Sequence, residues 1–443
     1  MPNPTKSTGK FVARHAEARI RTALTDTRIV AIVGPRQSGK TTLARRIASS
    51  DGRPYISLDD EQFRDFAQDD PAAFLRGQRV AVIDEIQRAP GLILALKQSV
   101  DEDPRPGRYL ITGSVDLFRS SISPDSLAGR VETIDLLPFS RAELAGSGAS
   151  RFLDRAFASD FPGLAVTGAT PDLIEHAVSG GYPEALSRTV PARRRDWLLA
   201  YARSLTERDV SEIAKLGKRD EMGRLIDHAA ASAGRLLNLS RLGTYLGVDG
   251  KTVDRWLVLL EHMFLIRRVR AWHRNEVKRL VRTPKLHFLD SGLLAALLRA
   301  GVGDIARDRR KLGPLLECLV HSELAKAAAL SVEAPTISHY RDKDRVEVDL
   351  VLERPSGEVV GVEVKANATV RPRDFQGLAR LQGRQAGRVP GRAIVPVGTS
   401  PAHRRALARH SRRDAGCLAA RRTPACCRTE TGVVLLMKLR GRR

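Results

Sequence analysis

The sequence of 443 residues has few cysteines and no long apolar run. No two Cys-x-x-Cys sets occur at metal spacing, so neither a disulfide framework nor a zinc ribbon is predicted. No stretch approaches the roughly 18 apolar residues of a membrane-spanning helix, and the first residues lack the apolar core of a signal peptide. We therefore expect a soluble, cytoplasmic protein with reduced thiols and no membrane contact. The cysteines are Cys318, Cys417, Cys426 and Cys427.

Acidic residues are scarce relative to basic ones. The chain has 51 Asp and Glu against 74 Lys and Arg, which gives a formal charge of +23. Such a charge suggests a polyanionic partner, above all nucleic acid. However, residues 384–443 hold fifteen Lys and Arg and only two acidic residues, and so carry +13 of the total. The charge therefore indicates a basic tail more than a basic fold.

Aromatic residues are absent after Phe375, and neither helical nor strand periodicity lasts long beyond Gln382. A highly charged segment with little periodic apolar content cannot offset the entropy cost of folding, about 1–2 kcal/mol per residue. We expect residues 384–443 to be a disordered basic tail, and a departure from the ancestral reading frame is one explanation of its composition. The alternative is an arginine-rich arm that binds nucleic acid.

What the chain does contain, near its N-terminus, is the pattern of a phosphate-binding loop. The apolar run 29–33 leads into Gly-Pro-Arg-Gln-Ser-Gly-Lys-Thr-Thr, and a helical pattern follows. Glycines at both ends allow a tight turn, the lysine offers a positive charge to the β- and γ-phosphates, and the first threonine can bind Mg²⁺. The N-terminus of the helix favours the same phosphates. The residues predicted to bind ATP are Gly34, Pro35, Arg36, Gln37, Ser38, Gly39, Lys40, Thr41 and Thr42, with Thr41 also a ligand of the metal.

Two further strand patterns end in side chains that suit hydrolysis. The run 79–83 continues into Asp84, predicted to hold the Mg²⁺ shell, and Glu85, predicted to polarise the attacking water. The strand pattern that starts at Tyr109 ends in Thr-Gly-Ser, where Ser114 can touch the γ-phosphate or the water. Serine and threonine also end strands simply as caps, so a structural role for Ser114 stays open.

Arg130 is a candidate arginine finger. It directly precedes the strand pattern 131–135. From that place an arginine can reach a phosphate of its own or of a neighbouring subunit, and a surface salt bridge is the alternative. Besides nucleic acid, the partners to consider are therefore a second copy of the chain or another protein.

These motifs resemble those of bacterial and archaeal AAA-type ATP-binding proteins that carry a C-terminal domain of unknown function. The resemblance spans residues from about 10 to 380 and stops where a closing strand would be expected. It implies an α/β fold with a doubly wound parallel sheet of the P-loop AAA type and ATP at its carboxyl edge. The motifs that carry it are Gly-Pro-Arg-Gln-Ser-Gly-Lys-Thr-Thr at 34–42, Asp-Glu-Ile-Gln at 84–87, Ile-Thr-Gly-Ser at 111–114 and Leu-Ala-Gly-Arg at 127–130.

A compact helical pattern in the middle of the chain resembles a winged helix. Two short apolar-periodic segments flank a glycine turn, and the run 264–270 can form the first strand of a wing. The second helix would offer Lys251, Thr252 and Arg255 to a DNA groove. A packing module that touches no DNA is the equally weighted alternative.

The C-terminal third contains a second group of charged residues. Glu317 lies in a helical pattern, and two strands of a predicted hairpin carry Glu347 with Asp349 and Glu363 with Lys365 on one face each. Mg²⁺-assisted hydrolysis of a phosphodiester suits this set. Asp349 and Glu363 would bind the metal, Lys365 would stabilise charge or orient water, and Glu317 would complete the shell.

This pattern of an acid, a spacer and acid-x-Lys resembles the restriction-endonuclease-like nucleases, although an ordinary half-exposed strand alternates in the same way. Two functions stay open. One is an ATPase whose conformational switch is coupled to a nuclease-like α+β domain. The other is an ATP-dependent DNA-binding or regulatory switch with an inactive docking domain. The expected domains are an ATPase core at 1–145, a helical lid or linker at 146–225, a winged-helix-like segment at 226–300, the nuclease-like domain at 301–383 and the tail at 384–443.

Overall fold

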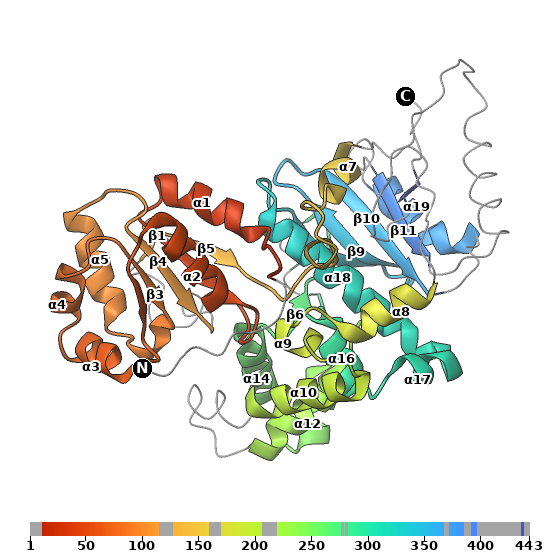
Figure 1. The fold of residues 1–443 in the computed structure, drawn as a ribbon. Helices are drawn as coiled ribbons and strands as arrows, with labels where there is room; N and C mark the ends of the chain where they lie inside the picture. Colours follow the sequence, from red (N-terminus) through yellow and green to blue (C-terminus); the bar gives the residue numbers. More distant parts are fainter. Residues whose placement is uncertain are drawn as a thin grey trace. The chain divides into compact units, whose positions relative to one another are not determined.

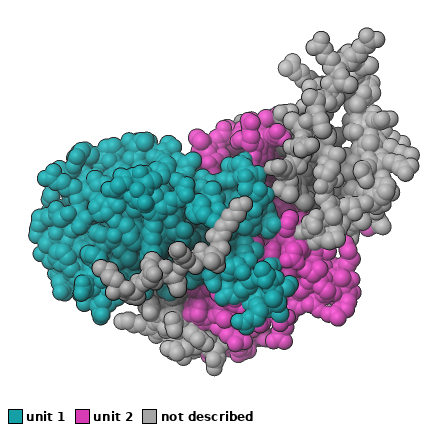
Figure 2. Space-filling view, in the orientation of Figure 1, with its two compact units in different colours: residues 1–149, 181–194 teal, residues 150–180, 195–443 magenta. Residues whose placement is uncertain are grey.

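The contacts of the chain divide it into two compact units (Figure 2). The first comprises residues 1–149 with 181–194, and the second comprises residues 150–180 with 195–443. In the described part of the chain, no helix is long and apolar enough to cross a membrane. The computed structural model describes residues 11–114, 127–158, 170–205, 219–275, 279, 282–366, 372–384, 391–396 and 436–437.

The first unit is built on a parallel sheet of five strands in the order β2-β3-β4-β1-β5 (Figure 1). Every residue of β1, β3 and β4 is buried, as expected for central strands of a parallel sheet covered on both faces. The predicted α/β fold with an AAA-like parallel sheet is confirmed. Its strands are β1 (Ile29–Val33), β2 (Tyr55–Ser57), β3 (Ala81–Asp84), β4 (Tyr109–Gly113) and β5 (Val131–Asp135). Its helices are α1 (Ala16–Asp26), α2 (Lys40–Asp51), α3 (Glu61–Asp69), α4 (Pro71–Arg76), α5 (Leu92–Glu102), α6 (Arg141–Leu144) and α9 (Pro183–Leu186).

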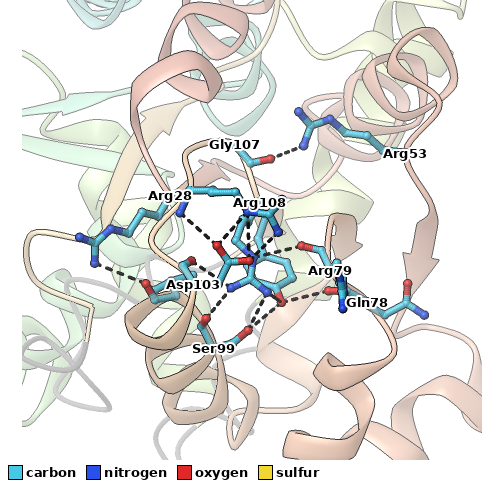
Figure 3. Close-up of polar contacts among 11 residues, drawn as sticks. Arg28, Arg53, Gln78, Arg79, Ser99, Asp103, Gly107 and Arg108 are labelled. Carbon is cyan, nitrogen blue, oxygen red and sulfur yellow. Dashed lines mark hydrogen bonds and ion pairs between the residues drawn. The ribbon is translucent and has the colours of Figure 1, made fainter.

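The amino edge of this sheet is held by Arg108, which directly precedes β4 (Figure 3). Its buried guanidinium donates to the carbonyl oxygen of Arg79 at 3.1 Å and to Oγ of Ser99 at 3.0 Å. The Tyr109 hydroxyl accepts from Arg108 at 2.9 Å and donates to the carbonyl oxygen of Gln78 at 3.0 Å. These bonds satisfy buried polar groups that precede β3 and lie in α5. The amino edge is therefore structural, which leaves the carboxyl edge for a ligand.

The second unit joins a helical region to a second five-stranded sheet of order β12-β11-β10-β9-β8 (Figure 1). Pairing in this sheet is antiparallel except between β10 and β11. The helices are α7 (Phe152–Ala158), α8 (Thr170–Ser179), α12 (Arg219–Ala231), α13 (Leu239–Leu246), α14 (Gly250–His262), α16 (Ser291–Leu297), α17 (Val302–Arg307), α18 (Leu312–Leu330) and α19 (Gln376–Arg384), with α10 (Pro191–Ser204) crossing from the first unit. The strands are β6 (Ile266–Val269), β7 (Lys285–Phe288), β8 (Thr336–Arg341), β9 (Glu347–Glu353), β10 (Val359–Lys365), β11 (Gly391–Pro396) and β12 (Leu436–Met437).

The helix-turn-helix pattern is present as α13 and α14, but the segment after the first wing strand is buried. Trp272 is 1% exposed and packs in one core cluster with Tyr340 of β8 and Val348 of β9. Its backbone N–H donates to the carbonyl oxygen of His339 at 2.5 Å, and the backbone N–H of His339 donates to the carbonyl oxygen of Arg270 at 3.0 Å. The described part of this segment therefore builds the core of the second unit and is not a free arm for DNA.

One expectation about the tail is wrong. We expected no ordered strand beyond Gln382, yet β11 pairs in parallel with β10, and β12 pairs with β11. The apolar core of β11 is only three residues, Ala393 to Val395, between Arg392 and Pro396, so its pattern is too short to identify locally. Its strand conformation depends on a partner distant in sequence. The remainder of 384–443, and with it the prediction of disorder, lies outside the described residues.

Candidate functional site

The phosphate-binding loop connects β1 to α2 and depends on its glycines. A Cβ atom added at Gly34 would lie 2.3 Å from the carbonyl oxygen of Leu136, so only glycine fits there. Gly39 has φ 96°, and Gln37 has φ 64°, a conformation that costs about 1–3 kcal/mol in a residue other than glycine. The loop thus stores backbone strain in a tight turn at the carboxyl end of β1.

Lys40 begins α2 and is 4% exposed. Its Nζ atom donates to the carbonyl oxygens of Gly34 at 3.0 Å and Pro35 at 2.9 Å. Burial lowers the pKa of the ammonium group to about 8, although the charges of Glu85 and Asp84 oppose the shift. Carbonyl dipoles compensate a buried cation only in part, so an anion placed against Lys40 would be stabilised.

The loop also contains an unsatisfied polar atom. The Ser38 hydroxyl is buried and has no hydrogen-bond partner among the described residues. Leaving a buried polar group unpaired costs about 1–3 kcal/mol, which a bound ligand oxygen would recover. The cradle at Gly34, the Lys40 ammonium and the Ser38 hydroxyl therefore fit the phosphates of a nucleotide.

Asp84, at the end of β3, is 1% exposed and accepts hydrogen bonds from three elements. Its Oδ2 atom accepts from Oγ1 of Thr41 at 3.0 Å and from the Tyr55 hydroxyl at 2.6 Å, and its Oδ1 atom accepts from Oγ1 of Thr112. Burial and the bond to Asp84 raise the pKa of Tyr55. Thr41 and Asp84, the predicted Mg²⁺ ligands, therefore lie together, and a hydroxyl and a carboxylate are suitable donors for that ion.

Glu85 and Ser114 are connected by a side chain to which we assigned no role from the sequence. The backbone of Glu85 is left-handed, with φ 60°, and its N–H donates to Oγ1 of Thr112 at 3.0 Å. Nε2 of Gln87 donates both to a carboxylate oxygen of Glu85 and to Oγ of Ser114, the latter at 2.8 Å. The signal was available, because Gln87 closes the Asp-Glu-Ile-Gln motif.

Arg14 is a second group that sequence analysis missed, because it lies outside every motif. Its guanidinium donates to the carbonyl oxygens of Ser38 and Leu137, both at 2.6 Å, and pairs with Glu143 at 3.0 Å. Burial lowers the pKa of Arg14, and the Glu143 charge opposes that shift. Burial raises the pKa of the Glu143 carboxyl, but the Arg14 charge and the N–H groups of Ser140 and His15 outweigh it and hold that pKa below its usual value. Arg14 thus fixes the backbone of the phosphate-binding loop through its bond to the carbonyl oxygen of Ser38.

Arg130 lies at the opposite edge of the sheet from the phosphate-binding loop. Its carbonyl oxygen accepts from the N–H of Ile29, the first residue of β1, whereas the loop follows the last residue of that strand. Its guanidinium pairs with Asp101 at 2.5 and 2.8 Å. The structure does not bring Arg130 to the phosphate-binding loop of its own subunit, because the length of β1 intervenes. The salt bridge is present, and contact with a neighbouring subunit stays a prediction.

In the second unit, the hairpin of β9 and β10 brings three predicted residues together. The N–H of Val364 donates to Oδ2 of Asp349 at 2.8 Å, and the N–H of Asp349 donates to Oε2 of Glu363 at 3.4 Å. Nζ of Lys365 donates to Oε1 of Glu363 at 2.5 Å. Burial, together with the Asp349 charge, raises the pKa of Glu363 to about 7. The predicted convergence of these side chains is therefore present.

A buried lysine that we did not predict lies in the same place. Nζ of Lys285, on β7, is 3.4 Å from Glu317, 3.5 Å from Glu347 and 3.6 Å from Asp349. Burial and the Asp349 charge raise the pKa of Glu317 to about 8. Burial lowers the pKa of Lys285, but the carboxylates, Glu317 first, outweigh it and raise that pKa above its usual value. The four carboxylates that surround this lysine and Lys365 are called the acidic cluster below: Glu317, Glu347, Asp349 and Glu363.

The acidic cluster does not have the geometry of a metal centre. Within the described ranges, no group of three or more His, Cys, Asp or Glu side chains is spaced to hold a metal ion. Three of its four carboxylates instead face the ammonium group of Lys285. The metal role of Asp349 and Glu363 stays a prediction that the geometry does not favour.

Three family models match the chain. An AAA domain matches residues 26–145, a domain of unknown function (DUF8612) matches residues 170–303, and another domain of unknown function (DUF4143) matches residues 312–406. The last match continues past Gln382, where we expected the family resemblance to stop. The family domain thus includes β11, in agreement with the pairing of that strand.

The chain is also similar to curated relatives and to solved structures. The uncharacterized proteins Rv2008c of Mycobacterium tuberculosis and Mb2031c of Mycobacterium bovis are each 32% identical over 360 residues, which is 80% of this chain and 74% of theirs. The Walker-type ATPase PABY2304 of Pyrococcus abyssi is 18% identical with a TM-score of 0.41, covering 65% of this chain and 96% of that one. The RuvB Holliday junction branch migration motor of Thermotoga maritima is 17% identical with a TM-score of 0.27, covering 58% and 90%. At these TM-scores the structural likenesses carry no functional argument. The chain belongs to the family of the two mycobacterial proteins and carries an AAA-type P-loop ATPase domain followed by two domains of unknown function.

Proposed function

We propose that the protein binds ATP with Mg²⁺ in the loop 34–42 and hydrolyses it to drive a conformational switch. The observation that carries the proposal is Lys40, a buried cation that only carbonyl oxygens bind within the loop. Such a group gains most from an external anion, because a phosphate supplies the full negative charge that carbonyl dipoles lack.

The proposed chemistry divides among residues of the carboxyl edge. Lys40 binds the β- and γ-phosphates, and Thr41 with Asp84 would hold Mg²⁺, which neutralises charge on the phosphates when bound. Glu85 orients and polarises the attacking water. Ser114 contributes a hydroxyl next to that water, and Gln87 fixes Glu85 and Ser114 relative to each other.

Paired variants test this division of roles. Glu85→Gln should leave ATP binding close to wild type but lower turnover by about 10²-fold or more, because it keeps the shape and removes the charge that polarises water. Equilibrium binding of a fluorescent ATP analogue and steady-state phosphate release measure the two effects. The matched control is Glu102→Gln, an exposed glutamate at the end of α5, which should change neither. Equal turnover by wild type and Glu85→Gln would refute the assignment.

We propose as a second role that the second unit docks onto nucleic acid through α14. Lys251 and Arg255 are exposed on this helix, whose N-terminus is capped by Asp249 through a 2.8 Å bond from the N–H of Thr252. Lys251→Gln with Arg255→Gln should weaken binding to duplex DNA and reduce the salt dependence by about one unit of slope per lost phosphate contact. Arg307→Gln, an exposed arginine on α17, is the control. An unchanged salt slope would remove this role.

A further inference from the structure

The central feature of the acidic cluster is the position of Lys285. One ammonium group lies 3.4–3.6 Å from carboxylates that belong to two different elements, Glu317 on α18 and the pair Glu347 and Asp349 on β9. The lysine side chain is 4% exposed. Three carboxylates around one point could supply oxygen ligands to a divalent cation, but here a cation of the chain itself already occupies that point.

Lys285 is held in place by its backbone. The neighbouring Leu286 exchanges hydrogen bonds with the segment before α13: its carbonyl oxygen accepts from Gly234 at 2.8 Å, and its N–H donates to Arg235 at 3.1 Å. The N–H of Leu237 donates to the carbonyl oxygen of Pro284 at 2.9 Å. β7 is thus bonded on both sides of Lys285, so the lysine cannot leave the cluster through a small movement of the chain.

The other carboxylate atoms are also engaged within the chain. Glu363 accepts from Lys365, Oδ2 of Asp349 accepts from the N–H of Val364, and Glu347 accepts from Arg341. Glu317 is covered on its other side, because a Cβ added at Gly234 would lie 2.8 Å from its Oε2 atom. Three cationic side chains therefore face four carboxylates, and most of the negative charge of the cluster is compensated from inside.

A bound Mg²⁺ would compete with this arrangement. The ion requires oxygen ligands at about 2.0–2.1 Å in near-octahedral geometry and keeps several waters. At the point where the carboxylates converge it would meet the Lys285 ammonium, a like charge in a buried environment. Burying two cations together costs more than the remaining carboxylate oxygens can return.

We infer that Lys285 is the resident cation of the acidic cluster and closes it to a divalent metal, so that the second unit does not cleave phosphodiesters by metal-assisted hydrolysis. The lysine takes the structural place of the ion and, with Lys365 and Arg341, compensates most of the negative charge of the carboxylates. The cluster then serves to join β7, α18 and β9, and the docking role of the second unit is separate from any cleavage.

Metal binding tests this inference without reference to activity. Mn²⁺ alone is titrated into full-length, nucleotide-free protein carrying Asp84→Asn, which removes the carboxylate among the two proposed metal ligands of the first unit. Bound Mn²⁺ is measured by electron paramagnetic resonance. With Lys285 present, we expect no site that depends on Asp349. Lys285→Met should create one, with a gain of about tenfold or more in affinity, and adding Asp349→Asn should abolish it.

Three results would overturn the inference. The first is an Mn²⁺ site in the lysine-containing protein that Asp349→Asn removes. The second is Mg²⁺-dependent nicking of DNA by otherwise wild-type protein that Asp349→Ala abolishes. The third is a folded Lys285→Met protein that gains no Mn²⁺ site. If Lys285→Met does not fold, the lysine-containing protein still decides the question, and Lys285→Arg, which keeps the charge, should fold and bind no Mn²⁺.

Discussion

The two units each contain a buried lysine, and the two lysines differ in what compensates their charge. Lys40 in the first unit is bonded to carbonyl oxygens, and burial lowers its pKa to about 8. Burial acts in the same direction on Lys285 in the second unit, but three carboxylates outweigh it and raise that pKa. The two lysines are similarly buried, but their pKa values shift in opposite directions. The charge of Lys40 can be compensated further by a bound anion, whereas the charge of Lys285 is already compensated by carboxylates of the chain.

The largest expected effect comes from removing the compensated lysine. Lys285→Met should lower the free energy of unfolding of the second unit by about 3–5 kcal/mol, because it leaves buried carboxylates without their cation. Chemical denaturation followed by the fluorescence of Trp256 and Trp272, both buried in that unit, measures it. The control is Lys251→Met, an exposed lysine on α14, which should change stability by less than about 0.5 kcal/mol. Similar stabilities for both variants would contradict the comparison.

The next effect concerns the residues of the first unit that are proposed to support hydrolysis. Gln87→Leu should lower kcat by about 10- to 100-fold with little change in nucleotide affinity, because Glu85 and Ser114 lose the group that positions them. Steady-state kinetics separate kcat from KM. If Gln87 acts only through Ser114, the double variant with Ser114→Ala should be no slower than the slower single variant. Gln98→Leu, on the exposed side of α5, is the control.

The buried histidines of the second unit should make their contribution to its stability depend on pH. Burial lowers the pKa of His321 to about 3 and that of His339 to about 4, whereas an unfolded histidine has a pKa near 6.5. At these two histidines the unfolded chain binds protons between pH 6.5 and about 4 that the folded chain does not, so the contribution of the histidines to stability falls as pH falls, by up to about 1.4 kcal/mol per pH unit for each group. Glu317 and Glu363, whose pKa values burial raises to about 8 and about 7, contribute in the opposite direction.

Thermal unfolding across that pH range measures this slope for each unit. The difference between wild type and His321→Gln isolates the histidine contribution from that of the two glutamates. His321→Gln, whose side chain cannot be protonated in this pH range, should remove the contribution of one histidine to the pH dependence of stability. A His321→Gln protein whose stability depends on pH as steeply as that of the wild type would contradict the account.

The smallest effect concerns subunit contacts. If Arg130 acts on a neighbour, mixing Arg130→Ala with Lys40→Ala protein should restore part of the ATP turnover, since each protomer supplies what the other lacks. Turnover measured over a range of mixing ratios tests this. Absence of rescue at every ratio would leave Arg130 as a structural partner of Asp101, which is the role its salt bridge already has.

Local sequence motifs predicted the site of the first unit, whereas most of the contacts in the second unit depend on packing between segments that are distant in sequence. The loop 34–42 and the strand ends at Asp84 and Ser114 are each encoded within a few residues, so sequence periodicity placed them. Arg14 has no local signal, because its bonds to Ser38 and Leu137 depend on the folded sheet.

The same limit explains the second unit. The alternation around Asp349 and Glu363 predicted the hairpin, but Lys285 lies on β7, which packs beside them only in the fold. The run 264–270 was predicted to be the first strand of a wing, but the burial of Trp272 just after it depends on contacts with β8 and β9. The pairing of buried carboxylates with a lysine thus cannot be predicted from local sequence patterns when the residues are distant in sequence.

Equilibrium binding of a non-hydrolysable ATP analogue with Mg²⁺ tests the comparison between the two lysines most directly. The dissociation constant is measured by calorimetry for wild type, Lys40→Ala and Lys285→Arg. We predict that Lys40→Ala weakens binding by about 10²-fold or more, because a buried charge-assisted contact is lost, and that Lys285→Arg binds like wild type. Undiminished binding by Lys40→Ala, or an equal loss in both variants, would contradict the account.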